Sequence, residues 1–255
     1  ENGLLQAVSD GLVGVRATAN DGTGIYGGTV IEISGQTSLT ERKGWWKFDD
    51  AADMLKATIG QPLTLSGSQT SVEGPVAGNL ATEVPLGSYL TMTHGIPANG
   101  GGDLVNEWSL QIDFSLPQID TWYAFFQTLD GDADMFVAKT EASDIGRVPN
   151  SIGSGSTRYT ANTVSANVWY RMIVSVKNGE FYKVYMNGEL WLDATGQDVD
   201  GRYALEPTLG IFQDDDGDDG TIRCSELAIW DVALTPGEAS ALGNATTSVT
   251  TDIKD

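Results

Sequence analysis

The sequence predicts an all-β protein, a sandwich of two packed antiparallel sheets followed by a short C-terminal helix. Between Trp45 and Leu242, short strand-like runs alternate with turn residues roughly every eight to twelve positions, as in sandwich domains. Few stretches show the helical periodicity of about 3.6 residues. The 31 glycines and the 40% hydrophobic content suit a core joined by many turns. The 255 residues therefore fit one large sandwich and part of a second module.

The charge balance excludes several classes of partner. Lys and Arg number 14 against 35 Asp and Glu, a net charge of −21 that repels phosphate backbones and anionic membranes. We therefore expect no nucleic-acid binding. No apolar run approaches the roughly 20 residues that span a bilayer, so we expect no membrane insertion. The single cysteine, Cys224, lies in an apolar run and is expected to be buried rather than reactive.

Residues 1–36 predict a separate, incomplete module. Two alternating strands, Leu12–Thr18 and Thr29–Ser34, flank an Asn-Asp-Gly-Thr-Gly turn. The segments NGLLQAVSDG, VRATANDGTG and TVIEISG resemble the second half of a bacterial immunoglobulin-like domain. About 36 residues cannot bury a core alone, so this segment is expected to lie against the main domain, to self-associate with another chain, or to be the remainder of a truncated neighbour. Because Glu1 follows no Met or leader, we expect a processed or excised piece.

The main domain is predicted over residues 37–243, and residues 244–255 form a polar linker or tail. Its helix is expected after Leu234, with Thr235 as N-cap, Pro236 at the first position and Glu238 completing a capping box. The predicted strands, in order, are Trp45–Phe48, Leu63–Leu65, Tyr89–Thr93, Trp108–Ser115, Trp122–Thr128, Met135–Ala138, Trp169–Val176, Glu180–Met186, Thr208–Phe212 and Thr221–Trp230.

Four motifs in this domain carry a resemblance to a known class. They are WWKFDDAADMLKATIGQPLTL, then VNEWSLQIDFSLP followed by WYAFFQT, then NVWYRMIVSVKNGEFYKVYMNGELW, and finally the hairpin around QDDDGDDG. Together they resemble the laminin G-like and concanavalin A-like lectin-glucanase superfamily. The resemblance implies a jelly-roll sandwich that serves as a calcium-stabilised carbohydrate-binding or adhesion module of a larger secreted or cell-surface protein. We expect an extracellular, bacterial protein whose partner is a polysaccharide or a glycoprotein glycan.

Two acidic turns are candidate calcium sites. Carboxylates at alternate positions can curl around one cation, and Ca²⁺ takes six to eight oxygen ligands. No His or Cys is nearby, which disfavours zinc. The alternative is a solvated acidic turn. The resemblance also brings the first strand close to the last one, which adds two further ligands. The predicted metal ligands are Asp214, Asp216, Asp218 and Asp219 in the first turn, Asp130, Asp132 and Asp134 in the second, and Asp49 and Asp50 after the first strand.

Aromatic and polar side chains on alternating strand positions predict a glycan-binding groove. Sugar binders stack sugar rings on aromatic faces beside amides and charged groups. Alternation places Trp122, Ala124 and Phe126 on one face of their strand, opposite Tyr123, Phe125 and Gln127. The predicted ligand-binding residues are Gln127, Arg147, Tyr159, Arg171, Lys183 and Tyr185.

Two alternatives stay open at this point. A polysaccharide lyase or glycoside hydrolase would need paired carboxylates on one strand, or a proton-transferring Tyr or His. No strand offers the carboxylate pair, and His94 is expected to be an ordinary surface-loop residue, although His94, Gln127, Arg171 and Tyr185 are of the types that a lyase needs. We therefore expect no catalytic residues. The other alternative is a structural subunit whose N-terminal strands complete a neighbour's sheet.

Overall fold

The computed structural model describes residues 11–33, 41–129, 135–137, 150–154, 158–195, 197–215, 217 and 220–246. The chain divides into two compact units. One contains strands β1 (Gly11–Thr18) and β2 (Tyr26–Ile33), and the other spans Thr40–Val249. No helix among the described residues is long and apolar enough to cross a membrane.

The first unit is a two-stranded antiparallel sheet. β1 and β2 pair in register from Gly11 opposite Ile33 to Thr18 opposite Tyr26, which confirms the two strands expected there. The turn is held by Asp21, whose Oδ1 accepts hydrogen bonds from the Thr23 backbone N–H and hydroxyl at 3.0 and 2.6 Å.

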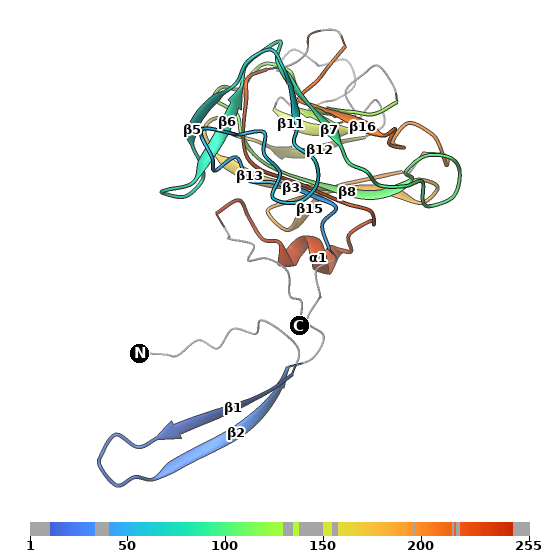
Figure 1. Ribbon diagram of the computed structural model, residues 1–255. Coiled ribbons are helices and arrows are strands. Elements are labelled where there is room, and N and C mark those ends of the chain that lie inside the picture. The colour runs from blue at the N-terminus through green and yellow to red at the C-terminus, as the bar shows by residue number, and fades with distance from the viewer. Residues whose placement is uncertain are drawn as a thin grey trace. The chain divides into compact units, whose positions relative to one another are not determined.

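The second unit is a sandwich of two antiparallel sheets, as predicted (Figure 1). All ladders between its named strands are antiparallel, and β17 pairs with β8 on one side and with β6 and β3 on the other. The seven-stranded sheet has the order β12 (Arg158–Thr163), β11 (Ser151–Ser154), β10 (Met135–Val137), β9 (Tyr123–Gln127), β16 (Thr208–Ile211), β7 (Tyr89–Thr93) and β4 (Thr64–Ser66). The eight-stranded sheet has the order β15 (Glu189–Thr195), β14 (Phe181–Met186), β13 (Trp169–Lys177), β8 (Glu107–Ser115), β17 (Ile222–Trp230), β6 (Leu80–Val84) and β5 (Thr70–Glu73), with β3 (Gly44–Trp46) added beside β17.

The core lies between the two sheets and follows the alternation of the central strands. On β8, Trp108 and Phe114 point inward and meet Phe126 and Phe125 of the opposite sheet edge-to-face, with ring centroids 5.7 and 4.6 Å apart. All four rings are fully buried. Burying such a side chain contributes about 2–3 kcal/mol, so the inward positions of β8 fix which face of the strand meets the core.

The alternation predicted for residues 122–128 breaks within β9. Phe125 and Phe126 both belong to the buried core, although strict alternation would send them to opposite faces. The pairing of β9 with β10 shifts its register between Met135 and Phe136, which leaves one residue of β9 unmatched. Such a bulge turns consecutive side chains to one side. Gln127 therefore returns to the outer face together with Ala124.

The C-terminal segment covers the outer face of the eight-stranded sheet. Ser109 Oγ donates to the Val232 carbonyl, and Ser175 Oγ donates to the Leu234 carbonyl, both at 2.9 Å. Helix α1 (Pro236–Ala241) follows on this side of the sandwich (Figure 1). Thr235 and Glu238 form the predicted capping box, in which each side chain bonds the other residue's backbone N–H.

Candidate functional site

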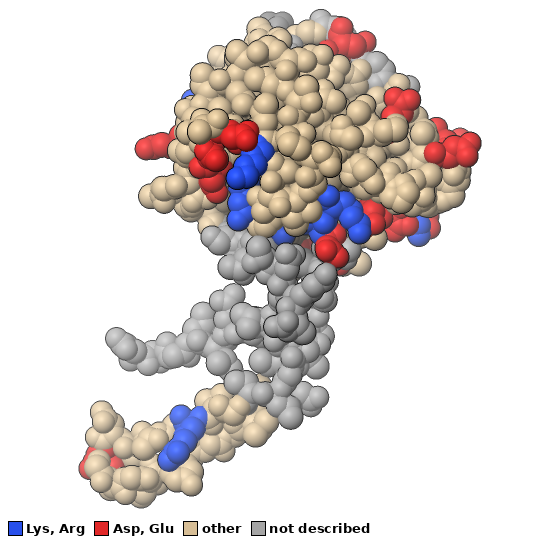
Figure 2. All heavy atoms as spheres, in the orientation of Figure 1, with Lys and Arg blue, Asp and Glu red and all other residues tan. Residues whose placement is uncertain are grey.

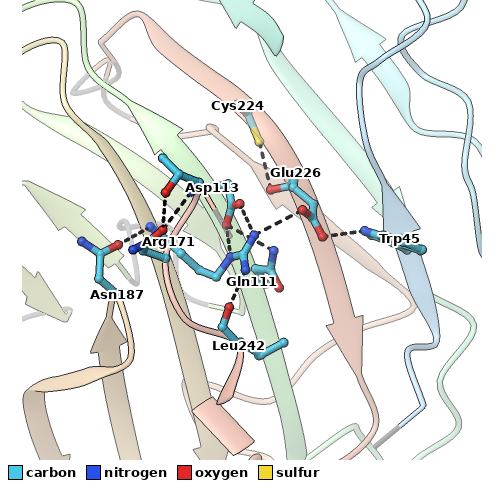
Figure 3. Close-up of polar contacts among 10 residues, drawn as sticks. Trp45, Gln111, Asp113, Arg171, Asn187, Cys224, Glu226 and Leu242 are labelled. Atoms are coloured by element: carbon cyan, nitrogen blue, oxygen red, sulfur yellow. Dashed lines mark hydrogen bonds and ion pairs between the residues drawn. The ribbon is translucent and has the colours of Figure 1, made fainter. Parts of the chain in front are cut away.

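A buried charged network lies on the outer face of the eight-stranded sheet (Figure 3). Arg171 on β13 donates from Nε to Asp113 Oδ1 at 2.8 Å and from Nη2 to Asp113 Oδ2 at 2.6 Å. Nη2 also lies 3.3 Å from Glu226 Oε2, and Nη1 donates to the Leu242 carbonyl at 2.6 Å. One guanidinium thus joins three strands of the sheet to the segment that follows α1.

Burial sets the electrostatics of this network. It raises the pKa of Asp113 to about 6, against the opposing pull of the Arg171 guanidinium. The side chains of Arg171 and Asp113 are each only 1% exposed. Gln111 donates to Asp113 Oδ1 at 3.2 Å, and its own Oε1 has no hydrogen-bond partner among the described residues. The buried pair of Arg171 and Asp113 holds the C-terminal segment in place and is closed to a ligand from solvent.

The network ends at a small surface hollow beside β3. Trp45 Nε1 donates to Glu226 Oε1 at 2.7 Å, and the Lys47 ammonium lies 4.1 Å from the centroid of a Trp45 ring. A second hollow adjoins the first and shares Lys47 and Asp49 with it. The first is lined by Trp45, Lys47, Asp49, Pro75, Val76, Asn79, Ser225, Glu226, Ala245 and Thr246.

A polar row crosses the outer face of the opposite, seven-stranded sheet. Strand pairing aligns Thr64 with Thr91, Thr91 with Gly210, and Gly210 with Gln127. Their strand neighbours Leu90, Leu209, Ile211 and Phe126 are buried in the core, so these four residues face outward. Gly210 has no side chain, and the side chain of Gln213 occupies the space where its Cβ would lie. Hydroxyl and amide groups therefore lie on this outer face.

Two aromatic residues stand on this sheet outside the main core. Trp122 and Tyr159 are partly buried and pack against Ala124 in a cluster of their own. Backbone pairing runs from Ala124 through Phe136 and Gly153 to Tyr159. Tyr159 on β12 and Trp122, which directly precedes β9, thus pack against Ala124 on the same face. The seven-stranded sheet thus combines aromatic surface with neutral hydrogen-bonding groups on its outer side.

The predicted ligand-binding residues do not share one surface. Gln127 and Tyr159 belong to the seven-stranded sheet, whereas Arg171, Lys183 and Tyr185 lie on the outer face of the eight-stranded sheet. The two groups lie on opposite outer faces of the sandwich, with the core between them. Arg171 and Tyr185 are also buried, and Lys183 lies 3.9 Å from Asp193. The single groove expected from all of them is therefore corrected to two separate faces. Arg147 lies outside the described residues.

The predicted metal ligands are only partly described. Pairing of β3 with β17 confirms that the first strand of the sandwich lies beside the last. However, Asp49 accepts a hydrogen bond from the Leu80 N–H at the start of β6, whereas the loop containing Asp214 leads into the pairing of Ile222 with Val84 at the end of β6. Leu80 and Val84 are four residue steps apart along β6, about 13 Å. Asp130, Asp132, Asp134, Asp216, Asp218 and Asp219 lie outside the described residues.

The proposed ligation of one cation by Asp49, Asp50 and the Asp214 turn stays a prediction. In the described structure Asp50 Oδ1 accepts from the Ala52 backbone N–H at 3.0 Å. In the part of the chain that the structure describes, no three His, Cys, Asp or Glu side chains come together as a metal site.

His94 and Cys224 are both buried. For Cys224 this confirms the expectation, and burial raises the pKa of its thiol well above the usual value. For His94 the surface-loop expectation was wrong, since the residue is only 6% exposed. Its Nδ1 accepts from the Ile96 N–H at 3.0 Å and its Nε2 donates to the Glu206 carbonyl. With both ring nitrogens used, His94 joins two loops and has no free nitrogen for proton transfer.

Sequence reasoning missed Asp113, Glu226 and Ser225 as members of a site. The available signal was the run Ser109-Leu-Gln-Ile-Asp113-Phe-Ser115, in which polar residues alternate with core residues. Such alternation normally marks a solvated face. Only the covering C-terminal segment turns this face into a buried network.

Figure 2 shows that, on the face of the sandwich turned toward the viewer, charged side chains form small groups separated by uncharged surface.

No family model matches the chain, and no curated protein matches it. Among solved structures, the chain resembles domain 4 of AbnA, a GH43 extracellular arabinanase from Geobacillus stearothermophilus solved in complex with arabinotriose. The TM-score is 0.54 at 20% identity, covering 80% of this chain and 98% of that one.

Toxin binding domains share the same architecture. The binding domain of Paraclostridial Mosquitocidal Protein 1 has a TM-score of 0.54 at 13% identity, covering 78% of this chain and 50% of that one. The binding domain of botulinum neurotoxin serotype D has a TM-score of 0.54 at 12% identity, with coverages of 79% and 50%. This chain thus spans nearly all of the arabinanase domain and about half of each toxin domain. At these identities the likeness concerns the sandwich fold.

Proposed function

We propose that the sandwich is a glycan-binding module of a larger extracellular bacterial protein, built on the laminin G and concanavalin A-like plan. The observation that carries this proposal is the outer face of the seven-stranded sheet. There the amides of Gln127 and Gln213 lie beside Gly210, while Trp122 and Tyr159 supply aromatic surface on the same sheet.

These groups suit the chemistry of sugars. Sugar hydroxyls both donate and accept hydrogen bonds, and amide and hydroxyl side chains do the same. The C–H faces of sugar rings pack on aromatic rings, which contribute large contact areas. The Gln213 side chain fills the space over Gly210, which brings its amide against the outer face of β16. An open face of this kind gives weak binding at each site, which repetition within a longer protein strengthens.

The fold comparisons support the same proposal by analogy. Domain 4 of the arabinanase was solved with arabinotriose, and the binding domain of botulinum neurotoxin DC was solved with SialylT. Analogy of fold raises the expectation of a binding role without identifying its ligand. The side chains on the seven-stranded sheet carry the assignment to this chain.

A glycan-panel measurement tests the proposal. Soluble oligosaccharides that include arabinotriose are titrated into the protein, and binding is followed by calorimetry and by backbone amide shifts. We expect shifts centred on Thr91, Gly210 and Gln213, and a loss of about tenfold in affinity for Trp122→Ala, the size of effect found for aromatic contacts. Lys183→Ala on the opposite sheet is the matched control and should bind as the parent does.

Two results would overturn the assignment to this face. Binding that survives in a Trp122→Ala/Gln213→Ala double variant would place the site elsewhere on the protein. No binding to any glycan of a broad panel would remove the proposed function. Release of new reducing ends in the same mixtures would instead favour the polysaccharide-degrading alternative.

We also propose that calcium stabilises the module. Asp214 and its neighbours Asp216, Asp218 and Asp219 form the acidic segment between β16 and β17, two strands that belong to different sheets. A cation bound there would reduce the repulsion between adjacent carboxylates and stabilise the loop that connects the two sheets. The chain's net charge of −21 favours uptake of such a cation.

A further inference from the structure

We propose that the hollow beside β3 binds an aliphatic ammonium group, as carried by a free diamine or by a lysine side chain. We call the hollow that contains Ser225 and Glu226 the inner hollow, and the adjoining one that contains Asp50, Asp53 and Lys56 the outer hollow. Both lie on the eight-stranded side of the sandwich, so the proposal does not depend on glycan binding by the other sheet.

An unpartnered hydroxyl marks the inner hollow. Ser225 is only 7% exposed, and its buried Oγ has no hydrogen-bond partner in the described structure. Leaving a buried polar group unpaired costs about 1–3 kcal/mol, and such groups in native proteins call for a reason. Ser225 occupies the shifted position where the pairing of β17 with β8 slips between Cys224 and Glu226. This bulge brings Ser225 and Glu226 together at the wall of the hollow.

The carboxylates around the hollow can accept further hydrogen bonds. Glu226 is fixed at both oxygens, by Trp45 Nε1 at 2.7 Å and by Arg171 Nη2 at 3.3 Å, and its side chain is 16% exposed. Each carboxylate oxygen has two lone pairs, so acceptor capacity remains. Asp49 is exposed and keeps Oδ2 available while Oδ1 accepts from Leu80 N–H. An ammonium group offers three donors for these oxygens and the Ser225 hydroxyl.

The balance of charge favours a cation over a neutral ligand. Around the two hollows, the carboxylates of Asp49, Asp50, Asp53 and Glu226 outnumber the ammonium groups of Lys47 and Lys56. Lys47 also shows that an ammonium is accepted here, because its Nζ already lies over the Trp45 ring at 4.1 Å. A divalent metal is disfavoured, since no three carboxylates of the described hollows converge on one point.

The volume of the inner hollow suits an ammonium group better than a sugar ring. The inner hollow has a volume of about 90 Å³, room for about three water molecules. A six-membered ring needs a cavity of about 150 Å³, as benzene does. An ammonium group with its first methylenes fits the inner hollow. The outer hollow, of about 390 Å³, then receives the rest of the ligand.

The test uses three probes with the full chain. 1,4-Diaminobutane represents a free amine, the blocked peptide acetyl-Gly-Lys-Gly-amide represents a lysine side chain, and 1,4-butanediol has the same length as the diamine without its charge. Backbone amide shifts of Asn79, Ser225 and Thr246 are followed during titration at low salt. We expect saturable shifts with an amine, with a Kd of about 1 mM, and none with the diol. The more tightly bound amine identifies the source of the ligand.

Variants distinguish a ligand site from a structural feature. Ser225→Ala should weaken amine binding about threefold, while the free protein becomes no less stable because an unpaired hydroxyl is removed. Asp49→Asn should weaken binding about threefold, and Lys47→Gln should tighten it by a similar factor because a competing cation is lost. Glu206→Gln removes the same charge at an exposed position away from the hollow and should change nothing. Absence of saturable shifts up to about 20 mM amine, equal binding of the diol, or weaker binding by Lys47→Gln would each overturn the proposal.

Discussion

Arg171 and Asp113 form a two-point ion pair across strands β13 and β8, with Nε–Oδ1 and Nη2–Oδ2 distances of 2.8 and 2.6 Å. The two residues are direct cross-strand partners in the ladder. Because the same guanidinium donates to the Leu242 carbonyl, the pair couples the sheet to the C-terminal segment that covers it. Buried pairs of this kind are costly to break from one side, since the remaining charge stays buried.

Removing Arg171 should therefore destabilise the sandwich strongly. We expect Arg171→Met to lower the free energy of unfolding by about 3–5 kcal/mol, measured by urea denaturation. The Arg171→Met/Asp113→Leu double variant should lose less than the sum of the two single variants, because neither charge is then left unpaired.

Lys183→Met is the matched control for this prediction. Its ammonium lies 3.9 Å from the exposed Asp193 carboxylate, so its loss should cost less than about 1 kcal/mol. Equal losses for Arg171→Met and Lys183→Met would contradict a special role for the buried pair.

The stability of the sandwich should depend on the ionisation of Asp113. Burial raises the pKa of Asp113 from 3.8 to about 6. Between these values the folded state holds a proton that the unfolded state has released, so the free energy of unfolding falls as pH rises through this window. The difference in stability between the parent protein and Asp113→Asn should decrease from about pH 4 to about pH 6 and then level off. A carboxyl resonance of Asp113 that titrates near 4 in the folded protein would contradict this.

His94 should act in the opposite direction. Burial lowers the pKa of His94 below 6.5, although the hydrogen bond to the Glu206 carbonyl opposes the shift. The unfolded state then binds a proton more readily than the folded state, so the stability that the neutral ring provides is lost as pH falls below about 6.5. We expect His94→Gln to be less stable than the parent at neutral pH, with the gap narrowing towards pH 5. A gap that is constant over this range would show that His94 titrates as it does in the unfolded chain.

Calcium should raise the melting temperature if the acidic segment after β16 binds it. At a hundredfold excess over Kd, binding adds about 2.7 kcal/mol, which for a domain of this size is about 5–10 °C. Magnesium should give a smaller rise, because it retains its waters. The Asp214→Asn/Asp216→Asn double variant should melt equally in calcium and in EDTA. An unchanged melting temperature of the parent after verified metal removal would contradict a stabilising calcium site and favour a solvated turn.

The long strands were predictable because the core imposes a simple period on them. β8, β13 and β17 were located to within one or two residues, since inward positions such as Leu110, Ile112 and Val174 alternate with outward ones. The capping box at Thr235 and Glu238 was predictable for a similar reason, because it depends on neighbours along the chain alone.

The strands β5, β6, β11, β12 and β15 escaped prediction. Two of them, Ser151–Ser154 and Thr70–Glu73, are four residues each and carry few apolar side chains, so they lack a local signal. Their hydrogen-bond partners define them instead. The bulge that turns Phe125 and Phe126 to one side likewise depends on pairing with β10.

The sequence by itself determined the fold class, the acidity and the residue types available for binding, because composition and period are local properties. Tertiary structure decided which side chains meet. It placed Gln127 and Arg171 on different sheets, covered Arg171 with the segment around Leu242, and set Asp49, Ser225 and Glu226 around one hollow. The order of the strands and the covering of a sheet by another segment arise from contacts between distant parts of the chain. Alternation within one strand carries no information about them.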